Sequence, residues 1–380
     1  MKKILFDLES TQPAGGAKRH GGGKYGEIVL TRIIERELPV ICCYNSQLWL
    51  NPEIKSLLEN NNIPLIDHNL KSYDEIVELN GISLFFIPVP INLKYEICKT
   101  NVQVLGVFHG LRSLESPIDY HQLLYKPLSN AFKYFAKKIL TKIFIRRSKK
   151  YYNKIFVSNN FKFLTVSHHS AASFKTFFPE FMNKDIPVFY SPSTSTINTT
   201  DRQYNDKYFL LVSANRHLKN NLRAIQAFDN LFSKGYAGKY RVKVVGTDTP
   251  QKSFRYRIKN KDKFDFIGYV DELKLDQLYH DAFCFVYPSL NEGFGYPPLE
   301  AMHYGVPVLS SPFASIAEIC GGSVMYFNPL SIDEITNRII QIMDESTHLK
   351  YSMLSKERYE VITNIQNEDL DKLVDYIYTI

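Results

Sequence analysis

Two glutamates that frame a glycine-containing loop are the residues of this chain best suited to chemistry. Glu292 is followed by Gly293 and Gly295, and Glu300 comes after seven intervening residues. The glycines let the backbone pass close to a ligand with its N–H groups unscreened by side chains. Carboxylates accept hydrogen bonds from sugar hydroxyls, and a helix start binds phosphate. The combination points to a ligand with both phosphates and hydroxyls. The alternative is a solvated loop glutamate and a second glutamate that complements a helix dipole.

The residues around the two glutamates predict a strand, a loop, a short helix and a second strand. Residues 283–287 form an apolar run typical of a buried parallel strand. The prolines at 297–298 suit the first turn of a helix, in which we also expect Glu300, and Gly305 suits its C-terminal end. The chain then returns to a strand at 306–310. The two carboxylates therefore frame the loop of a strand–loop–helix unit.

A basic loop follows another strand-like run, at 208–213. Arg216 and Lys219 lie between that run and a helical pattern that continues to Phe232. Two cations at the carboxyl end of a strand, just before a helix N-terminus, make a diphosphate site that requires no metal. The alternative is an ordinary basic loop. The Asp-x-Asp of 369–371 lies in a C-terminal helical pattern, so we expect neither a metal nor any other cofactor.

A glycine triplet stands near the start of the chain. Residues 1–7 predict a first strand, and Gly21, Gly22 and Gly23 belong to the loop that we expect before a helix at 27–36. Such a loop lies at the carboxyl edge of a parallel sheet, where these sheets bind ligands. The triplet does not have the spacing of the dinucleotide fingerprint. The alternative is a surface loop without a ligand.

His109 directly follows the strand-like run 102–108 and precedes a glycine. From the end of a strand, a side chain reaches the ligand edge of the sheet. Arg112 and Glu115, in the loop that follows, are candidates for the acceptor side of a site. A lone histidine in such a position is otherwise a structural residue.

The length and the alternation of elements predict two α/β domains. At 380 residues the chain is longer than one ordinary core requires. Strand-like runs alternate with helical patterns, which favours doubly wound parallel sheets. Residues 193–206 are rich in Ser, Thr, Asn and Pro and are interpreted as a linker. The predicted domains are 1–192 and 207–350, with a C-terminal helical segment at 351–380.

Composition suggests a soluble protein of a reducing compartment. Hydrophobic residues make up 44% and charged residues 22% of the chain, as in globular proteins. The five cysteines are scattered without disulfide or metal-ligand spacing. The first residues are too briefly apolar for a signal peptide, and no apolar stretch reaches the length of a membrane span. We therefore expect a cytoplasmic location.

Residues 126–154 concentrate the positive charge. They contain ten Lys or Arg and no acidic residue, which leaves a net charge of −3 on the rest of a chain whose total is +7. Phe132, Phe135, Ile139 and Ile143 recur among them at helical spacing. This pattern predicts a helix that lies on an anionic membrane surface, and so a peripheral position on the inner face of a membrane. The alternative is a packed helix with a solvated basic face. Because the charge is confined to one stretch, we expect no nucleic-acid partner.

The string Glu-Gly-Phe-Gly-Tyr-Pro-Pro-Leu-Glu-Ala-Met at 292–302 closely resembles the signature of the retaining glycosyltransferases of family 4. Residues 310–318 and 322–329 continue that family's pattern. The resemblance is strong over 208–329 and looser over 1–192. It implies the GT-B architecture, in which two Rossmann-like doubly wound domains face a central cleft. The first domain then binds mainly the acceptor and the second mainly the nucleotide sugar, and the C-terminal segment packs back on the first domain.

The resemblance also implies an activity and a role for each candidate residue. A hexosyl group moves from a nucleoside-diphosphate sugar to a hydroxyl of a glycan or lipid-linked glycan acceptor, with retention. Glu292 anchors donor sugar hydroxyls, Glu300 holds the ribose hydroxyls and His109 contacts the donor sugar. Arg216 and Lys219 stabilise the leaving diphosphate.

Further residues are carried over from the family to the walls of the site. The glycine-rich loop of Gly21, Gly22 and Gly23 is expected to face the donor diphosphate and the acceptor, and Arg112 and Glu115 the acceptor. The residues expected to line the donor site are Gly246, Gly268, Tyr269, Gly293, Phe294, Gly295 and Leu299.

Three alternatives stay open from the sequence. Lys219 followed by Asn220 resembles mannosyl- and rhamnosyltransferases of polysaccharide assembly, but uridine and guanosine donors both fit. A nucleotide-sugar epimerase shares the two-domain architecture. A noncatalytic protein that binds a nucleotide sugar or glycan would share it too, although the presence of all four charged site residues argues against that function.

Overall fold

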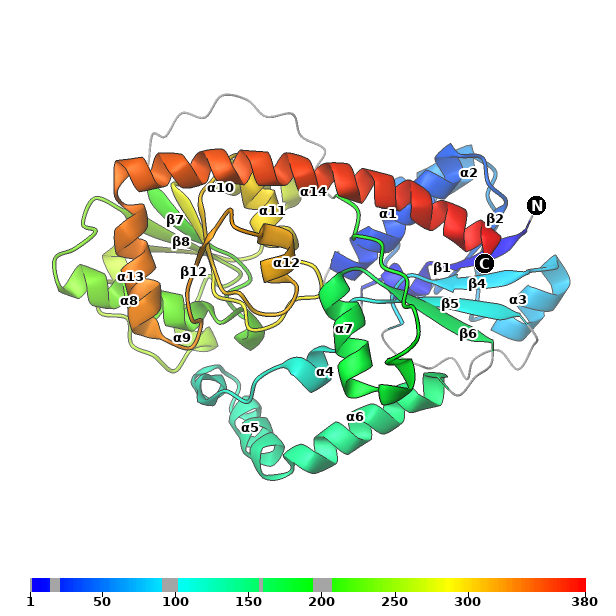
Figure 1. Ribbon diagram of the computed structural model, residues 1–380, viewed down its shortest axis with the longest axis horizontal. Coiled ribbons are helices and arrows are strands. Elements are labelled where there is room, and N and C mark those ends of the chain that lie inside the picture. The colour runs from blue at the N-terminus through cyan, green and yellow to red at the C-terminus, as the bar shows by residue number, and fades with distance from the viewer. Residues whose placement is uncertain (1, 14–20, 91–101, 157–159, 194–206) are drawn as a thin grey trace. The chain divides into compact units, whose positions relative to one another are not determined.

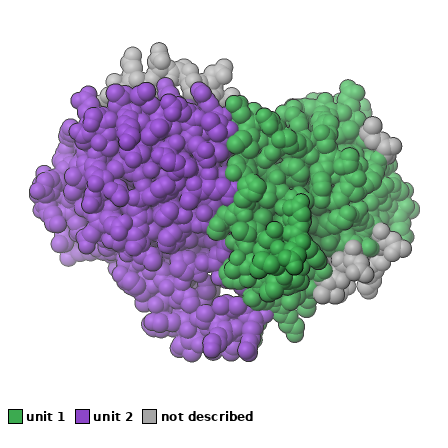
Figure 2. Space-filling view, viewed as in Figure 1, with its two compact units in different colours: residues 1–111, 147–194, 363–380 green, residues 112–146, 195–362 purple. Residues whose placement is uncertain are grey.

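The computed structural model divides into two compact units, each with its own sheet (Figures 1 and 2). It describes residues 2–13, 21–90, 102–156, 160–193 and 207–380. Unit 1 comprises residues 1–111, 147–194 and 363–380, and unit 2 comprises residues 112–146 and 195–362.

The sheet of unit 1 has six parallel strands in the order β3-β2-β1-β4-β5-β6 (Figure 1). This is the doubly wound order, in which the strand sequence reverses between β1 and β4 and ligands bind at the carboxyl ends nearby. Leu5, Ile41, Phe85 and Val104 lie in the buried core of the sheet. The strands are β1 (Ile4–Asp7), β2 (Val40–Tyr44), β3 (Leu65–Asp67), β4 (Leu84–Ile87), β5 (Gln103–Phe108) and β6 (Phe161–Thr165).

Helices α1 (Gly21–Glu35), α2 (Pro52–Asn60) and α3 (Tyr73–Asn80) connect strands of this sheet, with the 3-10 helix η1 (Glu9–Thr11). Helix α7 (His168–Phe177) and the 3-10 helix η3 (Pro179–Phe181) follow β6. The beginning of α1 differs from the prediction, because the glycine triplet at 21–23 forms its first turn rather than a loop. Tyr25 is fully buried, and a Cβ on Gly26 would come within 2.5 Å of Thr11. This close packing explains why a glycine is needed at position 26 of the helix.

The sheet of unit 2 repeats the topology of unit 1. Its strand order is β12-β11-β10-β7-β8-β9, which reverses between β7 and β10. Phe209, Val242 and Val286 are fully buried in its core. The strands are β7 (Tyr208–Leu211), β8 (Arg241–Val245), β9 (Phe264–Ile267), β10 (Cys284–Tyr287), β11 (Val308–Ser310) and β12 (Met325–Tyr326).

The helices of unit 2 include the one predicted after the glycine loop. Its α11 starts at Tyr296, so Glu300 lies in the second turn and not in the first, where the prolines had led us to expect it. The helices are α4 (Arg112–Glu115), α5 (Ser129–Ile139), α8 (Asn221–Ser233), α9 (Pro250–Ser253), α10 (Glu272–His280), α11 (Tyr296–His303), α12 (Ile316–Cys320) and α13 (Ile332–Ile342), with 3-10 helices η2 (Tyr120–Leu124), η4 (His217–Lys219) and η5 (Lys261–Lys263).

The domain boundaries differ from the prediction over residues 112–146, which belong to unit 2. Tyr125 is buried in the core cluster of unit 2, where its ring packs edge-on against Phe254 at 5.3 Å. Asp119 forms a buried ion pair with Arg223 of α8. These contacts fasten the segment to unit 2, although it follows the strands of unit 1 in the chain. The predicted linker at 193–206 lies, apart from residue 193, outside the described residues.

Two helices, one at the C-terminus and one in the basic stretch, begin in unit 2 and end in unit 1. Helix α14 (Glu345–Thr379) includes the predicted C-terminal helix, and its residues from 363 onward belong to unit 1. There Leu373 and Val374 are buried, and Asp369 accepts a hydrogen bond from the backbone N–H of Tyr190 at 2.8 Å. The basic stretch forms α5 and α6 (Thr141–Phe156), which adjoin at Leu140. Within the described residues, no helix is long and apolar enough to cross a membrane.

Candidate active site

A buried ion pair brings together two of the residues predicted to do chemistry. Lys219, in η4, donates from Nζ to Oε1 of Glu292 at 2.7 Å, and the two side chains are 13% and 9% exposed. The hydroxyl of Tyr287 donates to the same oxygen at 2.6 Å. The hydroxyl of Ser289 also donates to this oxygen. Among the described residues, none donates a hydrogen bond to Oε2 of Glu292. One carboxylate oxygen is therefore fixed by the protein, while the other is left for a ligand hydroxyl.

The electrostatics keep Glu292 ionised at neutral pH. Burial acts to raise its pKa, but the charge of Lys219 and the hydrogen bonds from Lys219, Ser289 and Tyr287 outweigh burial and hold the pKa below the ordinary value. Burial and the neighbouring carboxylate raise the pKa of Tyr287 well above its usual range. Glu292 is thus suited to accept hydrogen bonds and to stabilise positive charge, but not to donate a proton.

The two loops that carry the pair meet because β7 and β10 are neighbours in the sheet. Their carboxyl ends flank the point at which the strand order reverses, where such sheets bind ligands. The backbone N–H of Leu290 donates to the carbonyl of Leu218 at 2.8 Å. The side-chain amide of Asn220 donates to the carbonyls of Pro288 and Pro329 at 3.0 and 2.7 Å. These bonds fix the position of Lys219 relative to Glu292.

The glycine loop is held by Ser315, which follows β11 in the chain. The hydroxyl of Ser315 donates to the carbonyls of Glu292 and Phe294 at 3.0 and 2.7 Å. Gly295 caps α11 with φ = 124°, a backbone conformation that residues other than glycine rarely adopt. Phe294 and Leu299, predicted to line the donor site, are each 4% exposed. Their side chains pack inside unit 2, so a ligand would meet their backbone only.

Glu300 lies on α11 beside the buried Tyr279 of α10. Burial, and then the charge of Glu300 and its hydrogen bond with the Tyr279 hydroxyl, raise the pKa of Tyr279 well above its usual range. Tyr279 therefore stays a hydrogen-bond donor that orients the carboxylate.

Arg216 precedes η4 and is exposed. Its guanidinium makes no ion pair or hydrogen bond with any side chain that the structure describes. An unpaired guanidinium at the carboxyl end of β7 is available to a phosphate.

The loops after β8 and β9 continue this edge of the sheet. Gly246 has φ = 105°, and a Cβ there would lie 3.0 Å from the backbone nitrogen of Ala214. The backbone N–H of Gly246 donates to the carbonyl of Ile267 at 2.8 Å. Gly268 follows β9, and Tyr269 is 80% exposed. The structure thus places these three predicted residues along one edge with the ion pair.

A second buried ion pair, which the sequence analysis missed, supports the basic loop. Arg223 of α8 donates to both carboxylate oxygens of Asp119 at 2.6 Å, and the side chains are 1% and 3% exposed. The same guanidinium donates to Oδ1 of Asn220 at 2.8 Å. Burial acts to raise the pKa of Asp119, but the hydrogen bonds from Arg223 and His217 and the charge of Arg223 hold it far below its usual range. The signal in the sequence is an arginine within the apolar stretch 222–225, but its partner lies 104 positions away.

The predicted residues of the first half of the chain fall into both units. His109 directly follows β5, as predicted; its Nε2 lies 3.0 Å from the carbonyl of Pro88, and its ring packs edge-on against Tyr25. Arg112 and Glu115 form α4, in unit 2 rather than in the predicted first domain. Glu115 accepts a hydrogen bond from the side chain of Asn291 at 2.9 Å. The structure therefore brings Glu115 next to the Glu292 loop.

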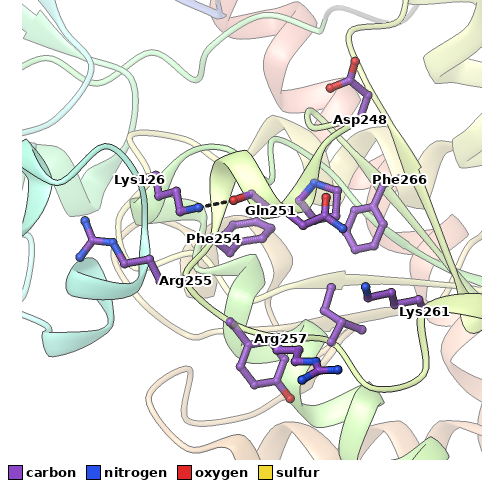
Figure 3. Close-up of a pocket in the computed structure, with 11 residues that line it drawn as sticks. Lys126, Asp248, Gln251, Phe254, Arg255, Arg257, Lys261 and Phe266 are labelled. Carbon is purple, nitrogen blue, oxygen red and sulfur yellow. Dashed lines mark hydrogen bonds between the residues drawn. The ribbon is translucent and has the colours of Figure 1, made fainter.

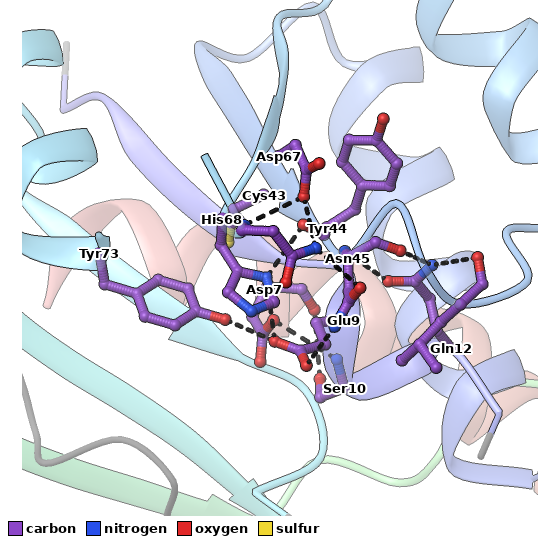
Figure 4. Close-up of polar contacts among 12 residues, drawn as sticks. Asp7, Glu9, Ser10, Gln12, Cys43, Tyr44, Asn45, Asp67, His68 and Tyr73 are labelled. Carbon is purple, nitrogen blue, oxygen red and sulfur yellow. Dashed lines mark hydrogen bonds and ion pairs between the residues drawn. The ribbon is translucent and has the colours of Figure 1, made fainter. Parts of the chain in front are cut away.

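Unit 1 also contains a polar cluster that the sequence analysis did not predict (Figure 4). Glu9 lies 3.2 Å from Nδ1 of His68, accepts a hydrogen bond from the Tyr73 hydroxyl at 2.7 Å and accepts another from Asn45 at 3.3 Å. Asp67 ends β3, and hydrogen bonds from Ser46 and Asn69 lower its pKa to about 2. These residues follow β1, β2 and β3, so their common position at the strand ends was the available signal. No group of three or more His, Cys, Asp or Glu side chains in the described part of the chain has the arrangement of a metal site.

Comparison with known proteins relates the second half of the chain to a family. Residues 194–361 match the family described as "Glycosyl transferases group 1". These residues are therefore similar to a glycosyl transferases group 1 domain. Over 82 residues the chain is 42% identical to the O-antigen chain mannosyltransferase B of Escherichia coli. That match covers 22% of this chain and 22% of the relative, so the chain matches about a fifth of that protein's length.

Solved structures show the fold of the whole chain. A glycosyltransferase from Rickettsia africae superposes with a TM-score of 0.64 at 15% identity, over 100% of this chain and 99% of that one. The Anabaena protein HepE, solved in complex with UDP and glucose, gives the same TM-score and identity with 100% of each chain covered. With the two doubly wound sheets, these likenesses confirm the predicted GT-B fold.

Proposed function

We propose that this protein is a glycosyltransferase that moves a hexosyl group from a nucleoside-diphosphate sugar to a hydroxyl of a glycan or lipid-linked glycan, in polysaccharide assembly. The observation that carries the proposal is the Lys219–Glu292 pair, in which both charged groups keep unused hydrogen-bonding capacity. An ammonium group has three donors, and Lys219 uses two of them, for Glu292 and the Tyr287 hydroxyl. The third donor and Oε2 of Glu292 are available to a phosphate and a sugar hydroxyl.

The proposed reaction retains the configuration of the anomeric carbon and uses no metal ion. Arg216 and Lys219 stabilise the charge that develops on the diphosphate as the bond between the anomeric carbon and the phosphate oxygen breaks. Glu292 holds donor hydroxyls and stabilises positive charge on the sugar. The acceptor oxygen forms the new bond from the same face, and its proton passes to the departing phosphate oxygen. No side chain then has to act as a base.

The donor is proposed to carry a mannosyl or rhamnosyl group. A relative that is 42% identical over 82 residues is named as a mannosyltransferase. Lys219 is followed by Asn220, which fixes the loop by two hydrogen bonds. The roles of His109 and Glu300 toward donor sugar and ribose belong to the same proposal.

The test starts with thermal unfolding in a panel of nucleotide sugars, because a ligand that binds the folded state raises its stability. The stabilising donor is then incubated with and without glycan acceptors, and the product's anomeric configuration is read by NMR. We expect transfer with retention only when an acceptor is present. Conversion of the donor sugar without acceptor would identify an epimerase instead, and binding without turnover a noncatalytic protein; either result contradicts the proposal.

We further propose that the enzyme works on the inner face of an anionic membrane, which it contacts through the surface of α5 and the start of α6. Phe132 is 76%, Ile139 78% and Phe135 53% exposed, and Leu128, Leu140, Ile143 and Phe144 are exposed beside them. Lysines and arginines separate these side chains, and no acidic residue occurs between 126 and 154. Such a surface binds an anionic bilayer because its apolar side chains enter the headgroup boundary and its cations attract the anionic lipids.

Sedimentation with vesicles tests this surface. The variant in which Lys137, Lys138, Arg146 and Arg147 become Ser should lose binding to vesicles with anionic lipid, since each cation contributes about 1 kcal/mol near such a surface. The matched control replaces four exposed lysines of unit 2 by Ser: Lys234, Lys239, Lys252 and Lys259. The control should sediment like the wild type. Equal binding to neutral vesicles, or equal losses in both variants, would contradict the proposed surface.

A further inference from the structure

Unit 2 contains a cavity of about 480 Å³ that the proposed transfer reaction does not use (Figure 3). It lies mainly under residues 250–258, which connect β8 to β9, and Phe266 of β9 and Lys126 complete its wall. None of its lining residues is among the predicted site residues. The volume is in the range of small-molecule sites.

The wall of the cavity is aromatic and aliphatic. Phe254 and Ile258 are 2% and 5% exposed and belong to the core of unit 2. Phe266 is half-buried against this core, and the Tyr256 hydroxyl is held by Asp229 at 2.8 Å. Since the wall is fixed by core packing, the cavity is a formed site for a ring or a hydrocarbon group rather than a gap between mobile side chains.

The rim of the cavity is positively charged. Lys126, Arg255, Arg257 and Lys261 line it, whereas Asp248 is the single acid among the eleven described lining residues. None of the four cations forms an ion pair with a carboxylate in the described part of the chain. Arg255 donates to the carbonyl of Leu123 and Lys126 to that of Gln251. The charged groups of Arg257 and Lys261 have no hydrogen-bond or ion-pair partner among the residues that the structure describes. A rim of unpaired cations over an apolar wall favours an anion that carries an apolar part.

We propose that this cavity binds a phosphorylated ligand. Its phosphate or diphosphate lies against Arg257 and Lys261, its ring or hydrocarbon part lies against Phe254 and Phe266, and Asp248 accepts a hydrogen bond from its hydroxyl or amino group. Two sources share this chemistry, namely a nucleotide or sugar phosphate and the headgroup of a lipid phosphate. The site does not depend on the proposed transfer, because its residues are separate from the Lys219–Glu292 pair.

Lysine footprinting with an acetylating reagent tests the site on the whole protein, with inorganic pyrophosphate as the probe. Pyrophosphate should slow the acetylation of Lys126 and Lys261. At a concentration about ten times the dissociation constant, mass action leaves only about one-tenth of the sites free, and so the labelling rate should fall about tenfold. Lys252 and Lys259 lie in the same connection but do not line the cavity, and their rates should not change. Lys219 reports separately on binding at the proposed active site.

Paired variants then assign the binding. Calorimetry should show that changing Arg257 and Lys261 to Ser removes a pyrophosphate site, whereas changing Lys252 and Lys259 to Ser, with the same loss of charge, does not. Nucleoside diphosphates and a short prenyl diphosphate distinguish the sources, since the true source should bind more tightly than pyrophosphate through its apolar part. Equal losses in both pairs, or protection of Lys219 alone, would overturn the proposal. Absence of glycosyl transfer would instead contradict the proposed function and leave the cavity result standing.

Discussion

Replacement of Asp119 by Asn should destabilise unit 2 strongly, because it leaves the charge of Arg223 buried and unpaired. The two side chains are 3% and 1% exposed, and both carboxylate oxygens accept from the guanidinium at 2.6 Å. Removal of one partner from such a buried pair costs about 3–5 kcal/mol. In a domain of this size each kcal/mol lowers the melting temperature by about 2–4 °C, so we expect a fall of about 6–20 °C.

A surface pair in the same unit provides the matched control. Arg241 also binds Asp265 through two hydrogen bonds, but these side chains are 48% and 34% exposed. Asp265→Asn should therefore cost less than about 1 kcal/mol. Thermal unfolding followed by circular dichroism compares the two variants, and Arg223→Met in the Asp119→Asn background should recover part of the loss because no unpaired charge remains. If Asp119→Asn lowered the melting temperature no further than Asp265→Asn, the buried-pair reasoning would be refuted.

Two buried carboxylates, Asp119 and Glu292, predict how stability depends on pH. The pKa values of Asp119 and Glu292 are both lowered in the folded protein. Unfolded carboxyl groups titrate at about 3.9 for Asp and 4.3 for Glu, so the stabilisation is complete above those values and is lost as the pH falls toward the folded pKa. The melting temperature of the wild type should decrease below about pH 4, and that of Asp119→Asn should decrease less steeply.

Three further predictions address the active site. Glu300→Gln should weaken binding of the bare nucleoside diphosphate, whereas Glu292→Gln should leave that binding nearly intact and lower the rate, as calorimetry and kinetics would show; equal losses of affinity would contradict the division of roles. Turnover should survive EDTA, and its loss with recovery on adding magnesium or manganese would contradict the diphosphate role of the loop 216–219. Gly295→Ala should cost about 1–3 kcal/mol because φ is 124° there, whereas Gly322→Ala, with open space around it, should be close to neutral.

Local patterns were sufficient to predict the strands that precede the candidate residues at their ends. The apolar run before Glu292 forms β10, and the run before Arg216 forms β7. Because all the strands of each sheet are parallel, residues that follow them come to one edge. This is why a sequence reading placed Lys219 and Glu292 in one site, although 73 positions separate them. Their direct hydrogen bond was not predictable, since it depends on the register of β7 against β10.

Long-range packing decided what the sequence could not show. Asp119 and Tyr125 follow β5 in the chain, and nothing near them indicates that they belong to unit 2. Their partners, Arg223 and Phe254, come later in the chain, after the first strand of the second sheet. Local propensity also failed at the beginning of α1, where the glycine triplet is helical although glycine is a poor helix former. For Asp119 and Tyr125 a tertiary contact outweighed the local signal.

The two buried ion pairs of unit 2 differ in a way that separates a structural role from a functional one. Both oxygens of Asp119 are occupied, by the Arg223 guanidinium and the backbone N–H of His121, so this carboxylate has no free oxygen for a ligand. From the described residues, Glu292 receives hydrogen bonds at Oε1 alone, and Lys219 keeps one donor. A buried charge whose hydrogen bonds are incomplete costs free energy, which a ligand with a phosphate and a hydroxyl would recover. The unsatisfied half of the Lys219–Glu292 pair is therefore where substrate binding should be sought.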